Sequence, residues 1–575
     1  MAKFLIGLVT GVILTGLFLI IAIFAVATRV REKAPTVADN STLVMEVDGD
    51  IPERAPVEYP IPFLERKAPP TVAELWTTLR KAAADPHVKA LVFEPRNLSV
   101  GWAKLEELRT DLENFKKSGK PLYAYLKTPG AREYYLATAA SRIYMDPEDE
   151  LNLKGMRFEL MYFKKTADKL GVQVEIEHAG RYKDFGDMFT RTSMSPETKE
   201  VMTSIIDDLY GNLIQRVAAG RRKSPDEIRA TIDDGPFLSK EAHDKGLVDA
   251  LLFEDQMFDE LKGKLNAGEL KKVSLREYLK VPLSAAGLEG KQRIALITGE
   301  GAISRGDAGQ DFSGDTGIES ESFDKLLRRV RNDGDIKGVV VRIDSPGGEV
   351  FASDAIWREM NLLSKKKPMV ISMSDTAASG GYYIAMTGDP VLAYPGTFTG
   401  SIGVVFGKAN LHGFYDKIGV TKDIISRGRF AEIDSDYQPL SPAGHEKLRT
   451  DIDENYRSFV GKVAQARKRK FDEIEPLAQG RVWLGSQAKA NGLIDELGGL
   501  DRAVELIKER AKIPRSERVT LVPYPPKRSI FDVMFNQTSE SALEARLPAL
   551  LKGWPLRIWS RGGMLRLMPY RIEVH

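Results

Sequence analysis

The chain has 575 residues, 43% hydrophobic and 29% charged, which is enough for several domains with sizeable apolar cores. Its formal net charge is +2, from 83 basic and 81 acidic residues, so no bulk charge favours nucleic acid or acidic ligands. The absence of cysteine excludes disulfides, thiol nucleophiles and cysteine-ligated metal sites, although it does not identify the compartment.

An uncharged and mostly apolar segment covers residues 4–28. A helix needs about 20 apolar residues to cross a bilayer, so this segment predicts a transmembrane anchor within residues 1–33. A cleaved signal peptide is the alternative, because Ala25-Val26-Ala27 resembles a cleavage site, but its apolar core is usually only about 7–15 residues. The basic residues at 29–33 favour a cytoplasmic location for the bulk of the protein by the positive-inside rule.

The remainder of the chain contains an internal duplication. Residues 134–137 (Tyr-Tyr-Leu-Ala) match residues 382–385 (Tyr-Tyr-Ile-Ala), and residues 168–172 match residues 416–420, both at an offset of 248. Matches in the same order at several distant places are improbable by chance. The sequence therefore predicts four regions after the anchor: a first repeat at 40–265, a linker at 266–290, a second repeat at 291–512 and a C-terminal extension at 513–575.

Each repeat alternates short β-rich runs with helical patterns, which is typical of parallel β–α units and predicts an α/β fold. Ser441 and Pro442 predict the N-cap and first turn of a long helix that continues to about residue 470. In the second repeat, strands are expected at 294–297, 338–343 and 369–372, and helices around 323–330 and from about 352.

The extension after Arg515 has no counterpart in the first repeat. The run that begins at Met568 predicts a strand, and aromatic residues alternate with basic ones around Trp554. A strand packed on its own domain is the favoured interpretation, and a membrane-surface or intersubunit contact is the alternative.

Three glycine-rich segments of the second repeat carry the candidate chemistry. Asp344-Ser345-Pro346-Gly347-Gly348 follows a buried-strand run, and backbone N–H groups at such a position can stabilise an oxyanion. Residues 377–383 place Ser379 in a small-residue turn into a helix. Residues 397–404 place Ser401 between two glycines, which permits the close approach of a peptide backbone.

Taken in order, these segments resemble the protease IV family, the signal peptide peptidases of the SppA type in peptidase family S49. The resemblance covers nearly the whole chain and is to the long, double-domain form. More distantly, the segments are similar to the crotonase superfamily and to the proteolytic subunit of Clp protease, which share the fold. The resemblance implies two tandem ClpP/crotonase-like domains behind one N-terminal transmembrane helix.

The resemblance also implies the roles of individual residues. Ser401 is expected to be the nucleophile, Lys183 in Gly180-Arg181-Tyr182-Lys183 the general base, and Gly347 or Gly348 the source of an oxyanion amide. Ser379 is the competing serine, because Clp-type relatives carry their nucleophile in a segment of that general kind, whereas the SppA family does not.

The duplication provides an independent test of these roles. Adding 248 to 183 leads to Ala431, and subtracting 248 from 401 leads to Leu153. The first repeat therefore has the lysine without the serine, and the second has the serine without the lysine. Because the two losses are complementary, the sequence predicts one site to which both repeats contribute.

The predicted chemistry requires an unusual lysine. A lysine with the ordinary pKa of about 10.4 is protonated at neutral pH, so its pKa must fall to roughly 7 before it can accept a proton from serine. Burial at the seam between the repeats can lower it that far. Tyr182 and residues 185–189 offer apolar cover, Ser426 is a candidate hydrogen-bond partner of the lysine, and we expect about 3 Å between Lys183 Nζ and Ser401 Oγ.

Several alternatives remain open. A histidine-based triad is the rival mechanism, with His178 and His412 nearest in sequence to the predicted dyad, although surface or packing roles are favoured for both. No zinc or ATP motif is present, so neither a metal nor a cofactor is predicted. An acyl-CoA hydratase or isomerase of the same fold, and a non-catalytic membrane scaffold, are the alternative functions.

The resemblance implies a membrane-anchored serine endopeptidase that degrades cleaved signal peptides and other short apolar peptides. It further implies a homotetramer in the bacterial inner membrane, with a single membrane pass and the catalytic part in the periplasm. This orientation conflicts with the positive-inside rule, and the family resemblance is given precedence. No nucleic-acid partner is expected.

Overall fold

The computed structural model describes residues 35–56, 68–306, 317–526 and 564–568, together with Gly7, Gly11, Leu14 and Thr15. No helix within these residues is both long and apolar enough to cross a bilayer. Apart from those four isolated positions, the anchor predicted at 4–28 lies outside the described residues, as does the aromatic stretch around Trp554.

The first half of the chain forms a parallel sheet with the strand order β8-β4-β3-β2-β1-β9. Its central strands are apolar and buried along most of their length, as expected where helices cover both faces of a parallel sheet. The strands are β1 (Ser41–Asp48), β2 (Val88–Arg96), β3 (Leu122–Leu126), β4 (Arg142–Met145), β8 (Ala250–Leu251) and β9 (Lys271–Ser274).

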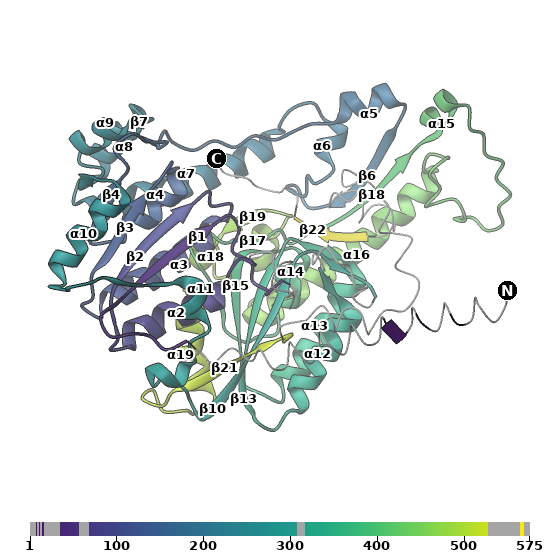
Figure 1. The fold of residues 1–575 in the computed structure, drawn as a ribbon. Coiled ribbons are helices and arrows are strands. Elements are labelled where there is room, and N and C mark those ends of the chain that lie inside the picture. The colour runs from purple at the N-terminus through teal and green to yellow at the C-terminus, as the bar shows by residue number, and fades with distance from the viewer. Residues whose placement is uncertain are drawn as a thin grey trace.

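Helices surround this sheet, and a short antiparallel pair lies beside it, formed by β5 (Glu150–Leu151) and β7 (Phe237–Leu238). Figure 1 shows this half in colours that run from purple through blue to teal. Its helices are α2 (Val72–Ala84), α3 (Trp102–Lys116), α4 (Ala131–Ala137), α5 (Lys164–Leu170), α6 (Asp187–Thr190), α7 (Pro196–Arg221), α8 (Pro225–Asp233), α9 (Ser239–Asp244), α10 (Glu254–Lys264), α11 (Leu275–Leu279) and the 3₁₀ helix η1 (Leu283–Ala286).

The second half forms a similar sheet with the order β19-β17-β15-β13-β10-β21, and β16 and β20 extend it beside β15. Its strand pairs are parallel except for β17 with β19. The strands are β10 (Gln292–Glu300), β13 (Ile336–Ser345), β15 (Met369–Ala378), β16 (Val391–Ala393), β17 (Phe398–Gly400), β19 (Val482–Leu484), β20 (Glu496–Leu497) and β21 (Val519–Tyr524).

The helices of the second half are α12 (Ser320–Asn332), α13 (Val350–Ser364), α14 (Gly380–Ile384), α15 (His412–Ile418), α16 (Pro442–Arg467), α17 (Phe471–Ile474), the 3₁₀ helix η2 (Glu475–Leu477), α18 (Gly485–Asn491) and α19 (Leu500–Arg510). The helix predicted from Ser441 is α16, and the Ser441 side chain accepts a hydrogen bond from Gly444 N, as an N-cap does. Five predicted elements of the second repeat lie within observed ones: 294–297 in β10, 323–330 in α12, 338–343 in β13, the helix from 352 in α13, and 369–372 in β15.

The duplication is visible in the element boundaries. Helix α3 begins and ends 248 residues before α13, and α5 begins and ends 248 residues before α15. The segment expected to be a linker, 266–290, contributes β9 to the edge of the first sheet and α11 to the packing beside it. The first unit thus packs residues on both sides of position 265.

A third sheet joins the two halves, with the order β12-β11-β14-β22-β18-β6. Strand β6 (Gln173–Ala179) comes from the first half and pairs antiparallel with β18 (Val404–Asn410) of the second, forming the projecting arm that ends in α5 and α15 in Figure 1. The remaining strands are β11 (Ile303–Ser304), β12 (Ile318–Glu319), β14 (Gly347–Glu349) and β22 (Met564–Leu567). The C-terminal extension therefore supplies a strand, which ends just before the predicted position at Met568.

Candidate active site

The pairing of β6 with β18 brings Lys183 to Ser401. Ala179, the last residue of β6, lies opposite Val404, the first residue of β18. The chain reaches Lys183 four residues after Ala179, and Ser401 precedes Val404 by three residues. Two segments far apart in sequence are thus fixed at the same end of one antiparallel ladder, and the two side chains meet within one chain.

The Lys183 ammonium nitrogen contacts three oxygens. Its Nζ lies 2.9 Å from Ser401 Oγ, 2.9 Å from Ser379 Oγ and 3.1 Å from the Ser401 carbonyl oxygen. All three side chains are completely buried. The lysine therefore reaches two serine hydroxyls equally well, of which only Ser401 was the expected partner.

The backbone packs closely around the lysine stem. Tyr182 N donates a hydrogen bond to the Gln479 carbonyl at 2.7 Å, which fixes the loop that carries Lys183. A β-carbon on Gly480, which has a φ of +75°, would lie 2.6 Å from Lys183 Cβ. Only glycine permits this approach, and the result is an enclosed site.

Burial sets the protonation state of the lysine. It holds the pKa of Lys183 well below its usual range, because the ammonium form loses its hydration. The neighbouring Asp184 carboxylate opposes this change, and the Arg566 guanidinium adds to it. Burial also raises the pKa of Asp184 to about 7, which weakens its opposition near neutral pH.

A neutral amine has two N–H donors and one lone pair, and three oxygens surround Nζ. The Ser401 carbonyl can only accept, so one N–H donates to it. The other N–H and the lone pair are divided between the hydroxyls of Ser379 and Ser401. Whichever hydroxyl faces the lone pair can transfer its proton to the lysine.

Ser379 occupies a strained strand-to-helix turn. It directly follows β15 and precedes α14, with φ +53° and ψ −112°, a conformation that costs energy in a residue with a side chain. The Ser379 side chain is completely buried in this turn, and the next backbone N–H is that of Gly380. Ser401 also has a positive φ, of +49°, but it follows a strand and no helix begins after it.

The glycine-rich loop predicted to supply the oxyanion amides lies beside Ser379. A β-carbon on Gly347, whose φ is +101°, would lie 2.6 Å from Gly380 N and 2.1 Å from the Arg566 carbonyl oxygen. The Gly347 amide donates to Ser345 Oγ at 3.2 Å. Gly348 lies opposite Arg566 in the antiparallel pairing of β14 with β22. A peptide carbonyl of β22 thus approaches this loop next to Ser379.

Strand β22 lies between β14, which contains Gly347 and Gly348, and β18, which begins three residues after Ser401. It pairs antiparallel with β14 on one side and with β18 on the other. Leu565 and Leu567 pack in an apolar cluster with Phe185 and Val405. Arg566 points the other way and lies over the Tyr383 ring, 3.7 Å from its centroid.

The other predicted participants lie elsewhere. Ser426 was a candidate partner of the lysine, but its hydroxyl donates to Glu432 Oε1 at 2.5 Å, and the contacts of Lys183 Nζ are with Ser379 and Ser401. His178 is exposed and contacts the Gly180 carbonyl, and His412 stacks on Tyr437 with ring centroids 4.2 Å apart. Neither histidine contacts Ser401 within the described residues.

Two functional features were not predicted from sequence. The contact between Ser379 and Lys183 was missed, although the similarity of residues 377–383 to the Clp-type segment was the signal that pointed to it. The placement of β22 against β14 was also missed, because the extension has no counterpart in the first repeat and no local pattern identifies its partner strands.

Comparison with known families gives two matches. The model of peptidase family S49 matches residues 114–268 and again residues 361–514, and the Clp protease model matches residues 316–397. The fold is therefore ClpP-like, with the S49 domain present twice.

Comparison with individual proteins gives long alignments to proteases. The chain is 36% identical to chloroplastic serine protease SPPA of Arabidopsis thaliana, over 79% of this chain and 68% of that protein. It is 32% identical to protease 4 of Salmonella typhi, over 83% and 79% of the respective chains. It is 31% identical to protease 4 of Haemophilus influenzae, over 75% and 72%.

Proposed function

This chain belongs to peptidase family S49 and is a serine protease, and from that premise we propose that Lys183 is the general base of a Ser-Lys dyad that cleaves peptides. The observation that carries the proposal is a buried lysine, with a pKa held well below its usual range, whose Nζ lies 2.9 Å from two serine hydroxyls. Ser-Lys pairs are an established variant of the serine-protease arrangement. The acyl-CoA enzyme and the scaffold are not retained as functions.

We assign the nucleophile to Ser401 and a positioning role to Ser379. Ser401 belongs to the Thr-Gly-Ser-Ile-Gly segment that carries the family resemblance, and its Oγ lies 2.9 Å from Lys183 Nζ. Ser379 Oγ lies equally close to Nζ, at 2.9 Å, from a strained turn, which suits a residue that holds the amine in place. This assignment keeps the sequence-based expectation for Ser401 and adds Ser379 as a second contact of the lysine.

The reaction then follows from these positions. Neutral Lys183 accepts the Ser401 proton as Ser401 Oγ attacks the substrate carbonyl, and the resulting ammonium gives that proton to the leaving amine. The Gly348 and Gly380 amides are the proposed oxyanion donors, because the Gly347 amide already donates to Ser345. Gly347 itself is needed for the turn that lets a substrate carbonyl approach.

The position of β22 supports a mode of substrate binding. An extended peptide in the same place would form backbone hydrogen bonds with β14 and β18 and would bury alternate side chains on opposite sides. The cluster that receives Leu565 and Leu567 is apolar. These features support short apolar peptides, including cleaved signal peptides, as substrates, and β22 must leave before such a peptide binds.

The broader setting remains part of the proposal. We propose a transmembrane anchor at 4–28 because that segment is uncharged and mostly apolar. The family resemblance is the basis for proposing a single-pass inner-membrane enzyme with a periplasmic catalytic part and a homotetrameric assembly. We also propose the division into repeats at 40–265 and 291–512, with the intervening segment packed on the first unit and the extension at 513–575 completing the third sheet.

Active-site labelling tests the dyad. A fluorophosphonate probe, followed by peptide mapping with mass spectrometry, should label Ser401 in the unmodified chain. Ser401→Ala and Lys183→Met should abolish labelling and the hydrolysis of a fluorogenic peptide, whereas Ser379→Ala should retain slowed labelling of Ser401. Ser118→Ala, in an exposed turn, is the matched control and should label normally. A label mapped to Ser379, with full labelling in Ser401→Ala, would assign the nucleophile to Ser379 instead.

A further inference from the structure

The strand position between β14 and β18 has two chemically different sides. Leu565 and Leu567 of β22 pack in the apolar cluster on one side, whereas Arg566 between them points to the other. The Arg566 side chain is only 1% exposed. A buried guanidinium is costly unless its surroundings compensate the charge, so the residues around it indicate what this side of the strand position accepts.

An aromatic surface faces the Arg566 guanidinium. Its central carbon lies 3.7 Å from the centroid of the Tyr383 ring and 5.3 Å from the centroid of the Phe459 ring. One of its terminal nitrogens donates a hydrogen bond to the Val350 carbonyl oxygen at 3.3 Å. Arginine stacks on aromatic faces because its cation is planar and weakly hydrated, so Tyr383 and Phe459 form a surface that suits it.

A carboxylate lies beside the same tyrosine. The Tyr383 hydroxyl donates a hydrogen bond to Asp354 Oδ1 at 2.5 Å, and Lys462 forms an ion pair with the same carboxylate. Burial opposes its ionisation, but Lys462, Tyr383 and Arg566 together hold the pKa of this carboxyl below its usual range. Burial also lowers the pKa of the Arg566 guanidinium, and Tyr383 and Asp354 oppose that change. The ionised Asp354 is therefore close enough to attract a cation held at the place of Arg566.

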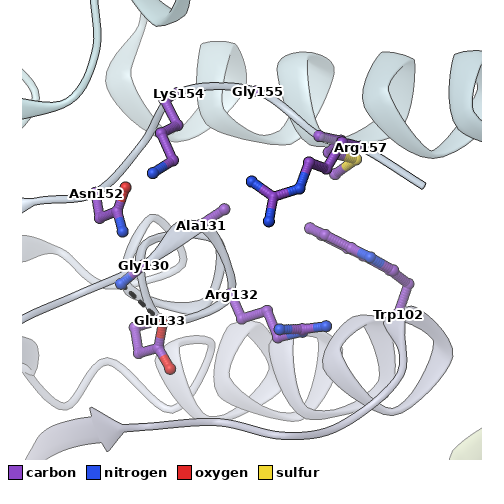
Figure 2. Close-up of a pocket in the computed structure, with 10 residues that line it drawn as sticks. Trp102, Gly130, Ala131, Arg132, Glu133, Asn152, Lys154, Gly155 and Arg157 are labelled. Atoms are coloured by element: carbon purple, nitrogen blue, oxygen red, sulfur yellow. Dashed lines mark hydrogen bonds between the residues drawn. The ribbon is translucent and has the colours of Figure 1, made fainter. Parts of the chain in front are cut away.

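The first unit covers the corresponding tyrosine with a side chain of its own. Tyr135 lies 248 residues before Tyr383, and Trp102 lies 248 residues before Val350. The Trp102 ring meets the Tyr135 ring edge-on, with the ring centroids 5.5 Å apart. Figure 2 shows Trp102 at the border of a cavity of about 450 Å³. In the second unit the smaller Val350 leaves the tyrosine ring to a residue of the strand position.

We propose that the strand position of the second unit contains a subsite for a basic side chain of the substrate, at the place of Arg566, in which Tyr383 and Asp354 determine specificity. This inference rests on the proposed function, in which a substrate peptide takes the place of β22. It narrows the substrate class to peptides in which an arginine directly adjoins apolar residues. Such a sequence occurs where the basic region of a signal peptide meets its apolar core.

Hydrolysis of four internally quenched peptides by the full chain tests the subsite. Each peptide contains Met-Leu-X-Leu-Met, the sequence of residues 564–568 with X at position 566, and X is arginine, citrulline, norleucine or glutamate. Citrulline has the shape of arginine without its charge. We expect kcat/KM to be about tenfold higher for arginine than for citrulline, and lowest for glutamate. Strand β22 competes with all four peptides alike, so the ratio does not depend on its displacement.

Two substitutions should move the arginine-to-citrulline ratio in opposite directions. Asp354→Asn removes the carboxylate charge and should lower the ratio about threefold. Lys462→Met removes the cation that competes for Asp354 and should raise it. Because the ratio compares two peptides on one variant, a partial loss of folded protein does not alter it. Asp244→Asn, which removes the carboxylate of an exposed pair with Lys240 in α9, is the matched control and should leave the ratio unchanged.

Equal kcat/KM for the arginine and citrulline peptides in the unmodified chain would overturn the subsite, as would a ratio that Asp354→Asn leaves unchanged. Hydrolysis of the norleucine peptide and fluorophosphonate labelling of Ser401 report separately on the proposed function. A chain that labels and cleaves norleucine without preferring arginine keeps its proposed function and loses the subsite. A chain that cleaves none of the four peptides contradicts the proposed function itself, and the subsite with it.

Discussion

At the scale of single residues, the decisive feature is the environment of Lys183. Its stem is enclosed by backbone, its nitrogen contacts three oxygens, and burial shifts its equilibrium toward the neutral form. Asp184 is the nearby charge that opposes this effect, and it is held by a hydrogen bond from Thr198. The protonation state of one side chain thus depends on a balance between desolvation and a neighbouring carboxylate.

This balance predicts the pH dependence of activity. The lysine must be neutral to accept a proton, so activity should rise with pH through its lowered pKa and fall on the acid side. Asp184→Asn removes a charge that raises the pKa, and the acid limb of the kcat/KM profile should move to lower pH by roughly 0.5 unit. The shift is small because Asp184, with a pKa of about 7, is only partly ionised near neutrality.

A pH profile of peptide hydrolysis measures this shift. Asp168→Asn is the control, because Asp168 pairs with Lys164 in helix α5 and is not among the charges that act on Lys183 or Asp184. A movement of the acid limb to higher pH in Asp184→Asn would show that the lysine is not the group that titrates.

At the scale of elements, short strands and turns position the chemistry. The β6–β18 ladder delivers the lysine, the end of β15 presents Ser379, and β14 brings glycine amides to the same point. Strand β22 completes this arrangement by lying between β14 and β18. None of these strands is longer than ten residues, yet their pairings fix the site because one end of each of β6, β15 and β18 lies beside Lys183, Ser379 or Ser401.

Substitution of Gly347 tests whether the position of β14 is required for activity. Gly347→Ala places a β-carbon 2.1 Å from the Arg566 carbonyl and forces a positive φ on a residue with a side chain, so β14 must shift. We expect kcat/KM for a fluorogenic peptide to fall at least 100-fold. Gly119→Ala is the matched control, since Gly119 also has a positive φ, of +82°, but nothing lies within 4 Å of the added carbon. It should cost about 1 kcal/mol of stability and leave kcat/KM unchanged. Comparable activity in both variants would contradict the proposed role of the glycine loop.

At the scale of the whole molecule, the halves are joined by buried charges as well as by the third sheet. Arg342 of β13 bonds to Glu53 and Glu107 of the first half and to Ser372 and Ser374 of its own sheet. Arg342 lowers the pKa of Glu53, whereas burial raises that of Glu107, because one guanidinium cannot fully compensate two carboxylates. Lys104 of α3 adds a second, largely buried pair across the seam, with Asp344 at 2.9 Å, so the seam depends on both cations.

Loss of the Arg342 cation should destabilise the fold. Arg342→Met leaves two buried carboxylates without their partner and should lower the free energy of unfolding by about 3–5 kcal/mol. Urea unfolding measures the loss. Adding Glu53→Gln and Glu107→Gln to Arg342→Met should recover part of it, and Lys240→Met, which removes an exposed pair with Asp244, should have no measurable effect. An unchanged urea midpoint in Arg342→Met would show that the seam does not rely on this network.

The sequence by itself determined the duplication, the alternation of strands and helices, the cap of α16 and the complementary loss of lysine and serine. These features follow from local propensity, hydrophobic period and comparison of the chain with itself. The tertiary structure alone decided that Lys183 contacts both Ser379 and Ser401 and that β22 lies between β14 and β18. The physical reason is that hydrogen bonds between strands such as β6 and β18 join residues as distant as 179 and 404, and no local pattern specifies which distant edge a short strand will meet.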